Sequence, residues 1–275
     1  MKLKTFTRRV AAAAVALAAL VPSTMSAYDF MEGGIYYNLN GQEATVTFGS
    51  QGYNSYSGNV VIPETVTHDG AVYTVTAIGD GAFGRSAGLT ALTIPNTIKR
   101  IGDHCFAYCT GLKNVVIPNS VVKLGRCAFH TSGLQSIVIG NSVKVIDEYC
   151  FQYSSSLKKA VLGSSVDSLA LKAFYDCPAL KDVTCLAPVP PHMYAYYSFG
   201  TYSGKLTVSA GSLEAYRNDP NWGRFSYFET LTLAQTLTID QSMITLHGGE
   251  TQQLSATVLP AEASQALSWP LPWAR

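Results

Sequence analysis

A hydrophobic pattern that repeats every 22 or 23 residues most limits what this chain can fold into. One phenylalanine marks each unit, and every step along the series is 23 residues except for a single step of 22. Three further series of mainly aliphatic residues keep the same spacing over five units. Because one such unit cannot bury its apolar side alone, the pattern predicts units stacked on a shared core. The phenylalanines are Phe83, Phe106, Phe129, Phe151 and Phe174.

Each unit divides into short extended pieces joined by turns. Segments such as 92–94 and 115–117 read as strands whose middle residue points outward while its neighbours face the core. A turn with asparagine or serine follows each strand, and stacked asparagines there can hydrogen-bond along the solenoid. A short helical or turn segment then carries the phenylalanine. A period in the low twenties is typical of leucine-rich repeats, so we predict a β-rich leucine-rich-repeat solenoid of about five 22–23-residue repeats over residues 59–186.

Segments without the repeat letters flank the solenoid and are predicted to cap it. Residues 28–58 contain short aromatic and β-branched runs between Gly and Asn turns, which indicates a β-rich N-terminal cap. An insertion around His68-Asp69-Gly70 reads as a hairpin. The pattern stops at the prolines after Cys185, and residues 187–234 are predicted to form a mixed α/β C-terminal cap with a strand at Lys205 to Val208. A short helix there would begin with Ser212 as its N-cap.

The first 27 residues predict export. Basic residues precede an apolar run of about a dozen residues, followed by a proline and small residues, which is the pattern of a Sec-type signal peptide over residues 1–27. The run is shorter than the roughly 20 residues of a spanning helix, so no transmembrane segment is expected in the mature chain. We therefore expect a secreted or cell-surface protein. With 19 basic and 18 acidic residues, the composition argues against nucleic acid as a partner.

The six cysteines are interpreted as packing residues rather than as ligands, nucleophiles or disulfide partners. Cys105 and Cys150 take the slot before the repeat phenylalanine, which alanine fills elsewhere, and Cys109 and Cys177 take a slot that serine fills elsewhere. A disulfide between neighbouring turns, such as Cys105 with Cys127, stays geometrically possible. The spacing of cysteines and histidines does not form two converging ligand pairs, and no phosphate loop or nucleophile elbow occurs. We expect no enzymatic activity, no cofactor and no metal site.

The unit V-x-I-P-N-S-V-x-x-I-G-x-x-A-F-x-x-C-x-x-L, clearest in residues 92–112 and 115–134, resembles the BspA-like leucine-rich repeat family of host-associated bacteria. The resemblance covers roughly residues 28 to 234. It implies binding of host extracellular-matrix or bacterial surface proteins rather than catalysis. Residues 235–275 resemble the start of a group 2 bacterial immunoglobulin-like domain, with Gly249-Glu250-Thr251 and Leu259-Pro260 in the expected places. Because such a sandwich takes about 100 residues, the domain is expected to be incomplete.

Outward residues of the repeated strands form the first candidate binding surface. The outward position holds a threonine in one strand and a valine in each of the next three strands. An apolar stripe of this kind can mark a partner site. The same valines are also explained by their suitability for strands, which is the simpler interpretation. A second outward row, two residues earlier in each strand, is more polar and consists of Ala91, Asn114, Ser136, Lys159 and Asp182. The candidate partner-binding residues, called the valine row below, are Thr93, Val116, Val138 and Val161.

Tyrosines offer an alternative surface. One group lies near the repeat phenylalanines, and a second group crowds the C-terminal cap, where packing within the cap is the favoured explanation. Aromatic platforms bind sugars as well as proteins, so a glycan-binding module is the alternative function. A passive spacer that holds another domain away from a surface is a third possibility. The two groups are Tyr108, Tyr149, Tyr153 and Tyr175, and Tyr194, Tyr196, Tyr197 and Tyr202.

Overall fold

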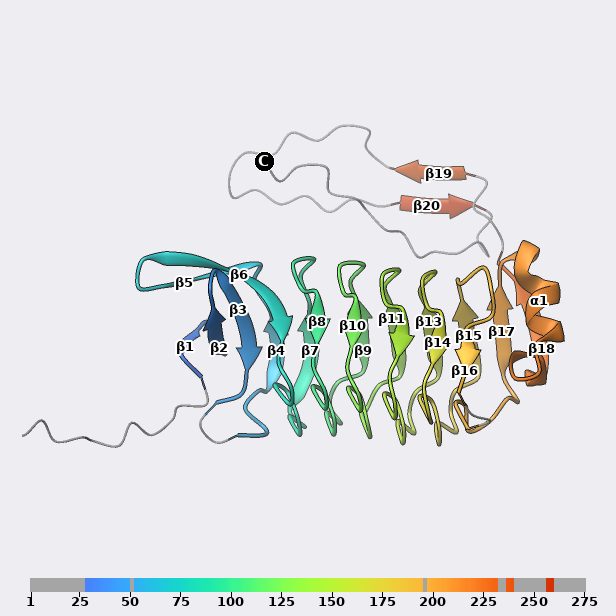
Figure 1. Ribbon diagram of the computed structural model, residues 1–275, viewed down its shortest axis with the longest axis horizontal. Coiled ribbons are helices and arrows are strands. Elements are labelled where there is room, and N and C mark those ends of the chain that lie inside the picture. The colour runs from blue at the N-terminus through green and yellow to red at the C-terminus, as the bar shows by residue number, and fades with distance from the viewer. Residues whose placement is uncertain (1–27, 50–51, 195–196, 232–235, 240–255, 260–275) are drawn as a thin grey trace, which may run out of the picture.

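The computed structural model describes residues 28–49, 52–194, 197–231, 236–239 and 256–259. The chain forms a β-solenoid in which successive turns stack along one axis (Figure 1). The predicted β-rich leucine-rich-repeat fold is therefore confirmed. The predicted signal peptide over residues 1–27 lies outside the described residues, as does most of the predicted immunoglobulin-like segment. Within that segment only β19 (Thr236–Ile239) and β20 (Ala256–Leu259) are described, and they pair antiparallel.

The N-terminal end is a β meander that joins the solenoid directly. Three strands pair antiparallel in sequence order, and the third pairs in parallel with β6. The predicted hairpin is present between β5 and β6, with Asp69 and Gly70 at φ values of 49° and 77° in its two-residue loop. The strands are β1 (Phe30–Glu32), β2 (Ile35–Asn40), β3 (Glu43–Thr47), β5 (Thr65–His68) and β6 (Ala71–Ile78).

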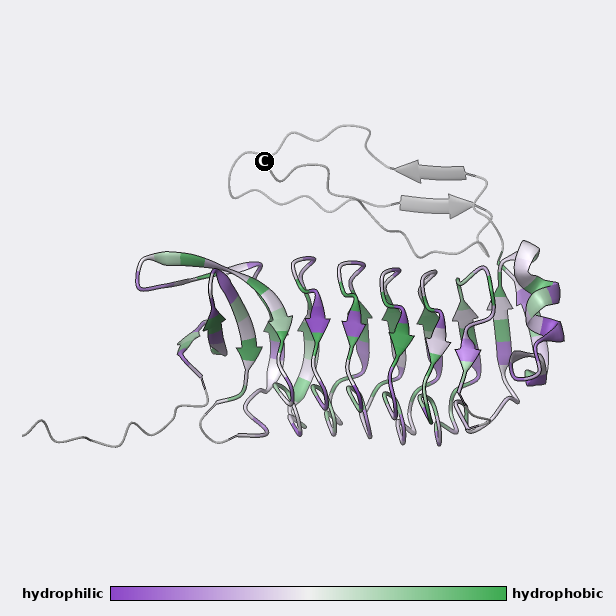
Figure 2. Cartoon of the chain, in the orientation of Figure 1, coloured by the Kyte–Doolittle hydropathy of each residue, from purple (hydrophilic) through white to green (hydrophobic). Residues whose placement is uncertain are grey.

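One side of the solenoid is a ladder of two-residue parallel strands that continues from β6. Figure 2 shows that this side changes from hydrophilic at β8 and β10 to hydrophobic at β12, because Arg100 and Lys123 give way to Val145 in the outward position. No apolar row therefore runs along it. The strands are β8 (Arg100–Ile101), β10 (Lys123–Leu124), β12 (Val145–Ile146), β14 (Ser168–Leu169) and β16 (His192–Met193).

A second side consists of longer parallel strands, and we call it the long-strand side. Its residues alternate between buried and exposed, as the sequence pattern predicts, so one face lies on the core. The paired strands β4 (Gly58–Val61) and β7 (Leu89–Thr93) precede it. The strands are β9 (Asn114–Ile117), β11 (Ser136–Ile139), β13 (Lys159–Leu162), β15 (Asp182–Cys185), β17 (Lys205–Val208) and β18 (Tyr227–Thr230).

The third side, called the turn side below, carries the repeat phenylalanines on segments without helix or strand. Backbone N–H groups there donate to carbonyls of the next turn, as Phe106 N does to Ala128 O at 2.7 Å. Each unit places two residues, four positions apart, in the left-handed region with φ between 53° and 64°. Sequence reasoning did not anticipate this conformation, because only one of the ten residues is glycine. The pairs are Gly81 and Arg85, His104 and Tyr108, Cys127 and Thr131, Tyr149 and Tyr153, and Lys172 and Asp176.

The repeat phenylalanines stack face to face through the centre of the solenoid. Adjacent ring centroids from Phe83 to Phe174 lie 4.8 to 5.4 Å apart, and all five rings are almost completely buried. Tyr56 extends the stack at its N-terminal end, with its ring 4.3 Å from that of Phe83. Rings at these separations interact favourably beyond the apolar area that they bury, so each turn is bonded to the next through its interior as well as its backbone.

The stack continues beyond the predicted repeat boundary at residue 186. Phe199 packs 5.1 Å from Phe174, and β17 and β18 extend the long-strand ladder in register. Trp222 and Phe225 then close the core, as predicted, while Phe228 is only partly buried. The cap also contains α1 (Leu213–Asn218) and the 3-10 helices η1 (Ala210–Ser212) and η2 (Trp222–Arg224).

Ser212 stands at the predicted N-cap position of α1, but it does not cap the helix through its side chain. This serine precedes α1, but its backbone already has helical angles, and its side chain makes no bond to the helix N-terminus. Its hydroxyl instead donates to the carbonyl of Pro188 at 2.8 Å. The 3-10 helix η1 leads directly into α1, so the residue that the sequence suggested as a cap lies inside a continuous helical run and anchors the proline-rich segment.

Candidate functional site

The valine row lies on the outer face of the long-strand side. Val138 pairs with Val116 in β9 and with Val161 in β13, so the three valines stand side by side on consecutive turns. Val116 has 63% of its surface exposed, Val138 and Val161 are partly exposed, and Thr93 at the end of β7 is exposed. The structure thus places all four predicted residues on one surface, with their outward direction fixed by strand alternation.

The valine row lines an open groove with a volume of about 620 Å³. Residues of the turns that follow the long strands, asparagines among them, line the same groove. A groove that combines apolar side chains with a few polar groups is the usual composition of a recognition surface. The groove is lined by Thr93, Val116, Val138 and Val161, by Asn96, Asn119 and Asn141, and by neighbouring residues of the same turns.

Asparagines along the groove hold successive turns together, but not through the bonds between asparagine side chains that the sequence suggested. The amide oxygen of Asn119 accepts the backbone N–H of Asn141 at 2.8 Å, and the oxygen of Asn141 accepts that of Ser164 at 3.0 Å. The asparagines therefore bond to the backbone of the next turn rather than to another amide side chain. Each oxygen is occupied in this way, which fixes the side chains that border the valine row.

Residues of the polar row, two positions before the valine row, mostly form hydrogen bonds and ion pairs with one another. Ser136 donates its hydroxyl hydrogen to the amide oxygen of Asn114 at 2.7 Å, and Lys159 lies 3.8 Å from the carboxylate of Asp182. Both contacts run between consecutive turns at the surface, where such pairs contribute little to stability. The polar row therefore has internal partners, whereas the exposed faces of the valines have none on their own strands.

Tyrosines of the two predicted groups have different surroundings. Tyr108 and Tyr153 are exposed, and Tyr149 and Tyr175 are partly exposed. In the cap, packing explains only Tyr202, whose ring lies 5.3 Å from that of Phe225. The packing interpretation is wrong for Tyr194 and Tyr197, which are 68% and 56% exposed. Tyr196 lies outside the described residues.

The cysteines are all free and buried, and several donate hydrogen bonds that sequence reasoning missed. The Cys109 thiol donates to the carbonyl of Phe83 at 3.0 Å, and the Cys177 thiol donates to that of Phe151 at 3.1 Å. Ser154, in the same slot, donates to the carbonyl of Phe129 at 2.9 Å. The slot therefore selects a small donor rather than merely a small side chain. Cys, Ser and Thr are the small residues able to donate.

Burial makes these thiols poor nucleophiles. It raises the pKa of Cys109 and of Cys177 to about 12, and it raises the pKa of Cys105 and of Cys150 well above the usual value. A thiol with such a pKa carries almost no thiolate near neutral pH, and the thiolate is the reactive form. His104 points to solvent while Cys105 is buried, so this adjacent pair does not converge on one ligand.

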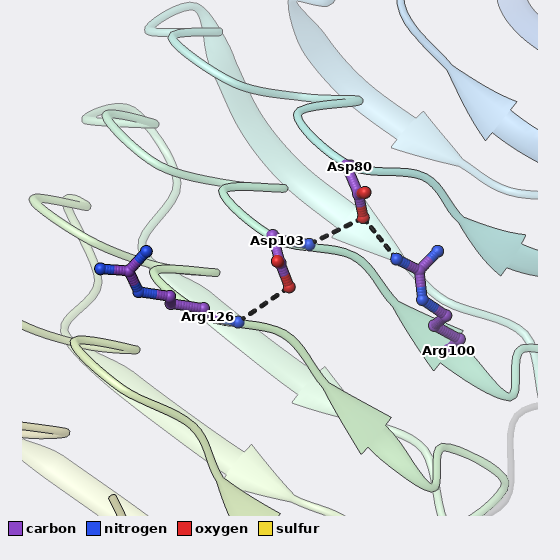
Figure 3. Close-up of polar contacts among 4 residues, drawn as sticks. All are labelled: Asp80, Arg100, Asp103 and Arg126. Carbon is purple, nitrogen blue, oxygen red and sulfur yellow. Dashed lines mark hydrogen bonds and ion pairs between the residues drawn. The ribbon is translucent and has the colours of Figure 1, made fainter. Parts of the chain in front are cut away.

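Acidic residues next to the turn side also have structural partners. One carboxylate oxygen of Asp80 accepts from the backbone N–H of Asp103 and from the Arg100 guanidinium, and the Asp103 carboxylate accepts from Arg126 N (Figure 3). Gly125 makes space for this arrangement, since a Cβ there would lie 2.5 Å from a carboxylate oxygen of Asp103. Asp103 is therefore not oriented toward His104. Within the described part of the chain, no group of three or more metal-ligating side chains occurs.

The fold and the groove identify the class of protein: it is a leucine-rich-repeat β-solenoid with an exposed strand face. A family model described as the BspA type leucine rich repeat region matches residues 76–196 in six copies, against the five or so expected. This match confirms the predicted recognition for the repeat region. A repeat region of this type indicates a protein-interaction role at a surface. The predicted resemblance of residues 235–275 to an immunoglobulin-like domain stays a prediction.

Solved structures with a similar arrangement come from bacteria. A leucine rich cell surface protein from Faecalibacterium prausnitzii A2-165 is 27% identical, with a TM-score of 0.41, over 62% of this chain and 56% of that protein. The T. pallidum leucine rich repeat protein is 19% identical, with a TM-score of 0.46, over 66% of this chain and 85% of that one. The chain thus spans little more than half of the first protein. No curated protein has significant similarity to this chain.

None of the described helices is long and apolar enough to cross a membrane.

Proposed function

We propose that this chain is an exported surface protein that binds a protein partner in the groove of the long-strand side. The observation that carries the proposal is that Thr93, Val116, Val138 and Val161 line one groove on consecutive turns. By the family resemblance, the partner is a host extracellular-matrix protein or a bacterial surface protein. We propose binding rather than catalysis, because burial raises the pKa of the cysteine thiols and the carboxylates of Asp80 and Asp103 accept structural hydrogen bonds.

Apolar contact rather than charge supports this mode of binding. The chain has a net charge of +1, so long-range attraction contributes little to association. An exposed valine row, in contrast, gains free energy when a partner removes it from water, at about 25 cal/mol per Å² of apolar surface. The repeated stack extends the row over several turns, which suits an extended or strand-like segment of a partner protein.

The proposal is tested by changing Val116, Val138 and Val161 together to Asp in the full chain. Binding to immobilised extracellular-matrix proteins should weaken by at least about tenfold, because carboxylates replace the apolar contact surface. Val122→Asp with Val145→Asp is the matched control, since both valines are exposed but lie outside the groove lining. A folded triple variant that binds as tightly as the wild type would overturn the proposal.

Glycan binding is a second candidate, favoured by exposed rings at the turn side. Tyr108 and Tyr153 are exposed although they belong to the repeat, and both contact the His130 ring at centroid distances of 5.6 and 5.5 Å. A glycan array set against immobilised matrix proteins separates the two candidates. A folded protein that binds in neither assay would instead be the passive spacer.

A further inference from the structure

An aromatic hollow lies where the turn side meets the C-terminal cap. Its volume is about 530 Å³, and its floor is the almost completely buried ring of Phe199. Tyrosine rings border it, and the Tyr175 and Tyr197 centroids are 6.1 Å apart at an angle of 81°. Tyr197 nevertheless remains 56% exposed, so packing within the cap does not account for its position. The lining is Tyr175, Tyr197, Phe199, Gly200, Tyr202 and Arg224.

Positive charge accompanies these rings. The Arg224 guanidinium lies 4.3 Å from the centroid of the Tyr202 ring, and the Lys172 ammonium lies 5.1 Å from that of Tyr175. Neither cation forms an ion pair with any of the residues that the structure describes. One exposed carboxylate, that of Asp176, follows Tyr175 in the chain. The hollow therefore combines aromatic surface with one lining cation, Arg224, and Lys172 stands over Tyr175 at its edge.

The same combination continues along the turn side away from the hollow. The Arg85 guanidinium lies between two tyrosine rings, 5.7 Å from Tyr53 and 5.2 Å from Tyr108. The His130 ring then bridges Tyr108 and Tyr153. Arg85 likewise forms no ion pair within the described residues. We call the line from Tyr53 through Arg85, Tyr108, His130 and Tyr153 to the hollow the tyrosine stripe. It advances by about one ring for each turn.

From this arrangement we propose that the tyrosine stripe and its terminal hollow bind an acidic polysaccharide, a chain of sugar rings that carry carboxylate or sulfate groups. Aromatic rings offer flat apolar surfaces to the C–H faces of sugar rings. The guanidinium groups bind planar anions through paired N–H donors. Since the rings recur at the spacing of the turns, the site suits a linear polymer. The inference rests on the glycan-binding candidate and is independent of the groove.

Polygalacturonate and its fully methyl-esterified form provide a matched pair of probes, because they share one sugar backbone and the ester replaces each carboxylate with an uncharged methyl ester. The full chain should bind polygalacturonate at least about tenfold more tightly than the ester, and added salt should weaken only the charged complex. Dextran sulfate set against dextran distinguishes sulfate from carboxylate recognition. Tighter binding of either charged polymer than of its neutral counterpart supports the proposal and identifies the preferred anion.

Variants locate the site. Arg224→Ala should weaken polygalacturonate binding by about tenfold, while Lys123→Ala removes an exposed cation on β10 and should leave it unchanged. Tyr197→Ala should weaken binding of both polygalacturonate and its methyl ester. Tyr227→Ala, which removes a 68% exposed ring on β18, should weaken neither. Circular dichroism confirms that each variant folds. The triple valine variant should bind polygalacturonate as the wild type does, which separates this site from the groove.

Several results would overturn the inference. Equal affinity for polygalacturonate and its ester, together with equal affinity for dextran sulfate and dextran, would leave glycan binding standing but remove the requirement for acidic groups. Equally tight binding of polyglutamate would show that the site recognises negative charge on any polymer rather than sugar rings. Unchanged affinity in both folded Arg224→Ala and Tyr197→Ala variants would place the binding elsewhere. Absence of binding to all of the charged and neutral polysaccharides would remove both the inference and the glycan candidate.

Discussion

The long-strand side and the turn side are made by the same repeat, yet they expose opposite chemistry. The long-strand side presents small β-branched residues whose direction follows strand alternation, as in Val116 and Val138. The turn side presents large rings and cations, such as Tyr108 and Arg85, from residues with positive φ. One repeat thus produces an apolar groove and an aromatic, cationic stripe on different sides of one core.

The difference arises from backbone conformation rather than from composition. In a strand, neighbouring side chains alternate between core and solvent, so a single register decides which residues are exposed. On the turn side, left-handed residues on both sides of each phenylalanine reverse the chain locally, and residues close to a buried ring become exposed. Non-glycine residues adopt this conformation at a cost of roughly 1 to 2 kcal/mol each, which the stacked turns must offset.

The largest expected effect concerns how each side contributes to the core. The turn side supplies one phenylalanine per unit, whereas the long-strand side supplies two aliphatic residues. Phe129→Ala should lower the free energy of unfolding by about 3–5 kcal/mol, because it leaves a gap in the ring stack, while Ile139→Val should cost about 0.5–1.5 kcal/mol. Urea denaturation measures both. Equal losses would show that the ring stack has no special weight.

A close backbone contact at the end of the long strands gives the next effect. A Cβ on Gly163 would lie 2.2 Å from the carbonyl oxygen of Gly140 in the preceding turn. Gly163→Ala should therefore destabilise the protein by about 1–3 kcal/mol through overpacking. Gly211→Ala is the control, because a Cβ there meets no atom within 4 Å. If both variants had the same melting temperature, the turns would be more loosely stacked than this contact requires.

Backbone strain on the turn side gives a smaller effect of opposite sign. His104 is exposed and has a φ of 53°, so glycine at this position relieves strain. His104→Gly should raise the free energy of unfolding by about 0.5 kcal/mol, whereas His104→Val should lower it by about 1 kcal/mol, since a β-branched residue suits positive φ least. Thermal melts of both variants test the sign. A His104→Val variant as stable as the wild type would contradict the left-handed assignment.

The smallest expected effect is the pH dependence of the turn side. Burial and then the nearby His104 lower the pKa of His130, while a hydrogen bond between His130 and the Gln152 side chain partly opposes this shift. The hydroxyl of Thr131 lies 2.9 Å from its Nδ1. Because the folded state binds fewer protons than the unfolded state, stability should fall as pH drops below about 6.5. His130→Gln should flatten this slope in pH-dependent melts. An unchanged slope would assign it to other groups.

Sequence reasoning identified the features that regular spacing controls. The phenylalanine series gave the buried stack, and the alternating strands gave the outward direction of Thr93, Val116, Val138 and Val161. The register also separated packing cysteines from ligands. Each of these inferences needs only a constant step and strand geometry, which a repeated sequence records directly.

The remaining features depend on conformation or on partners outside the repeat. Positive φ values at His104 and Tyr149 have no glycine to signal them. The sequence therefore indicated the turn-side tyrosines as an alternative surface but not the left-handed backbone that exposes them. Phe199 follows Phe174 by 25 residues rather than 22 or 23, which hid the continued stack. The donor role of Cys109 depends on a carbonyl 26 residues away. The sequence did contain one signal for this donor role, because only Cys and Ser occur three residues after each repeat phenylalanine.

Crossed binding measurements on two variants test most directly whether the two sides are separate binding surfaces. The triple change of Val116, Val138 and Val161 to Asp and the single change Arg224→Ala are each measured against an immobilised matrix protein and against polygalacturonate. The triple variant should lose only the protein ligand, and Arg224→Ala should lose only the polysaccharide. If either folded variant weakens both ligands to the same extent, the two sides do not act as separate surfaces.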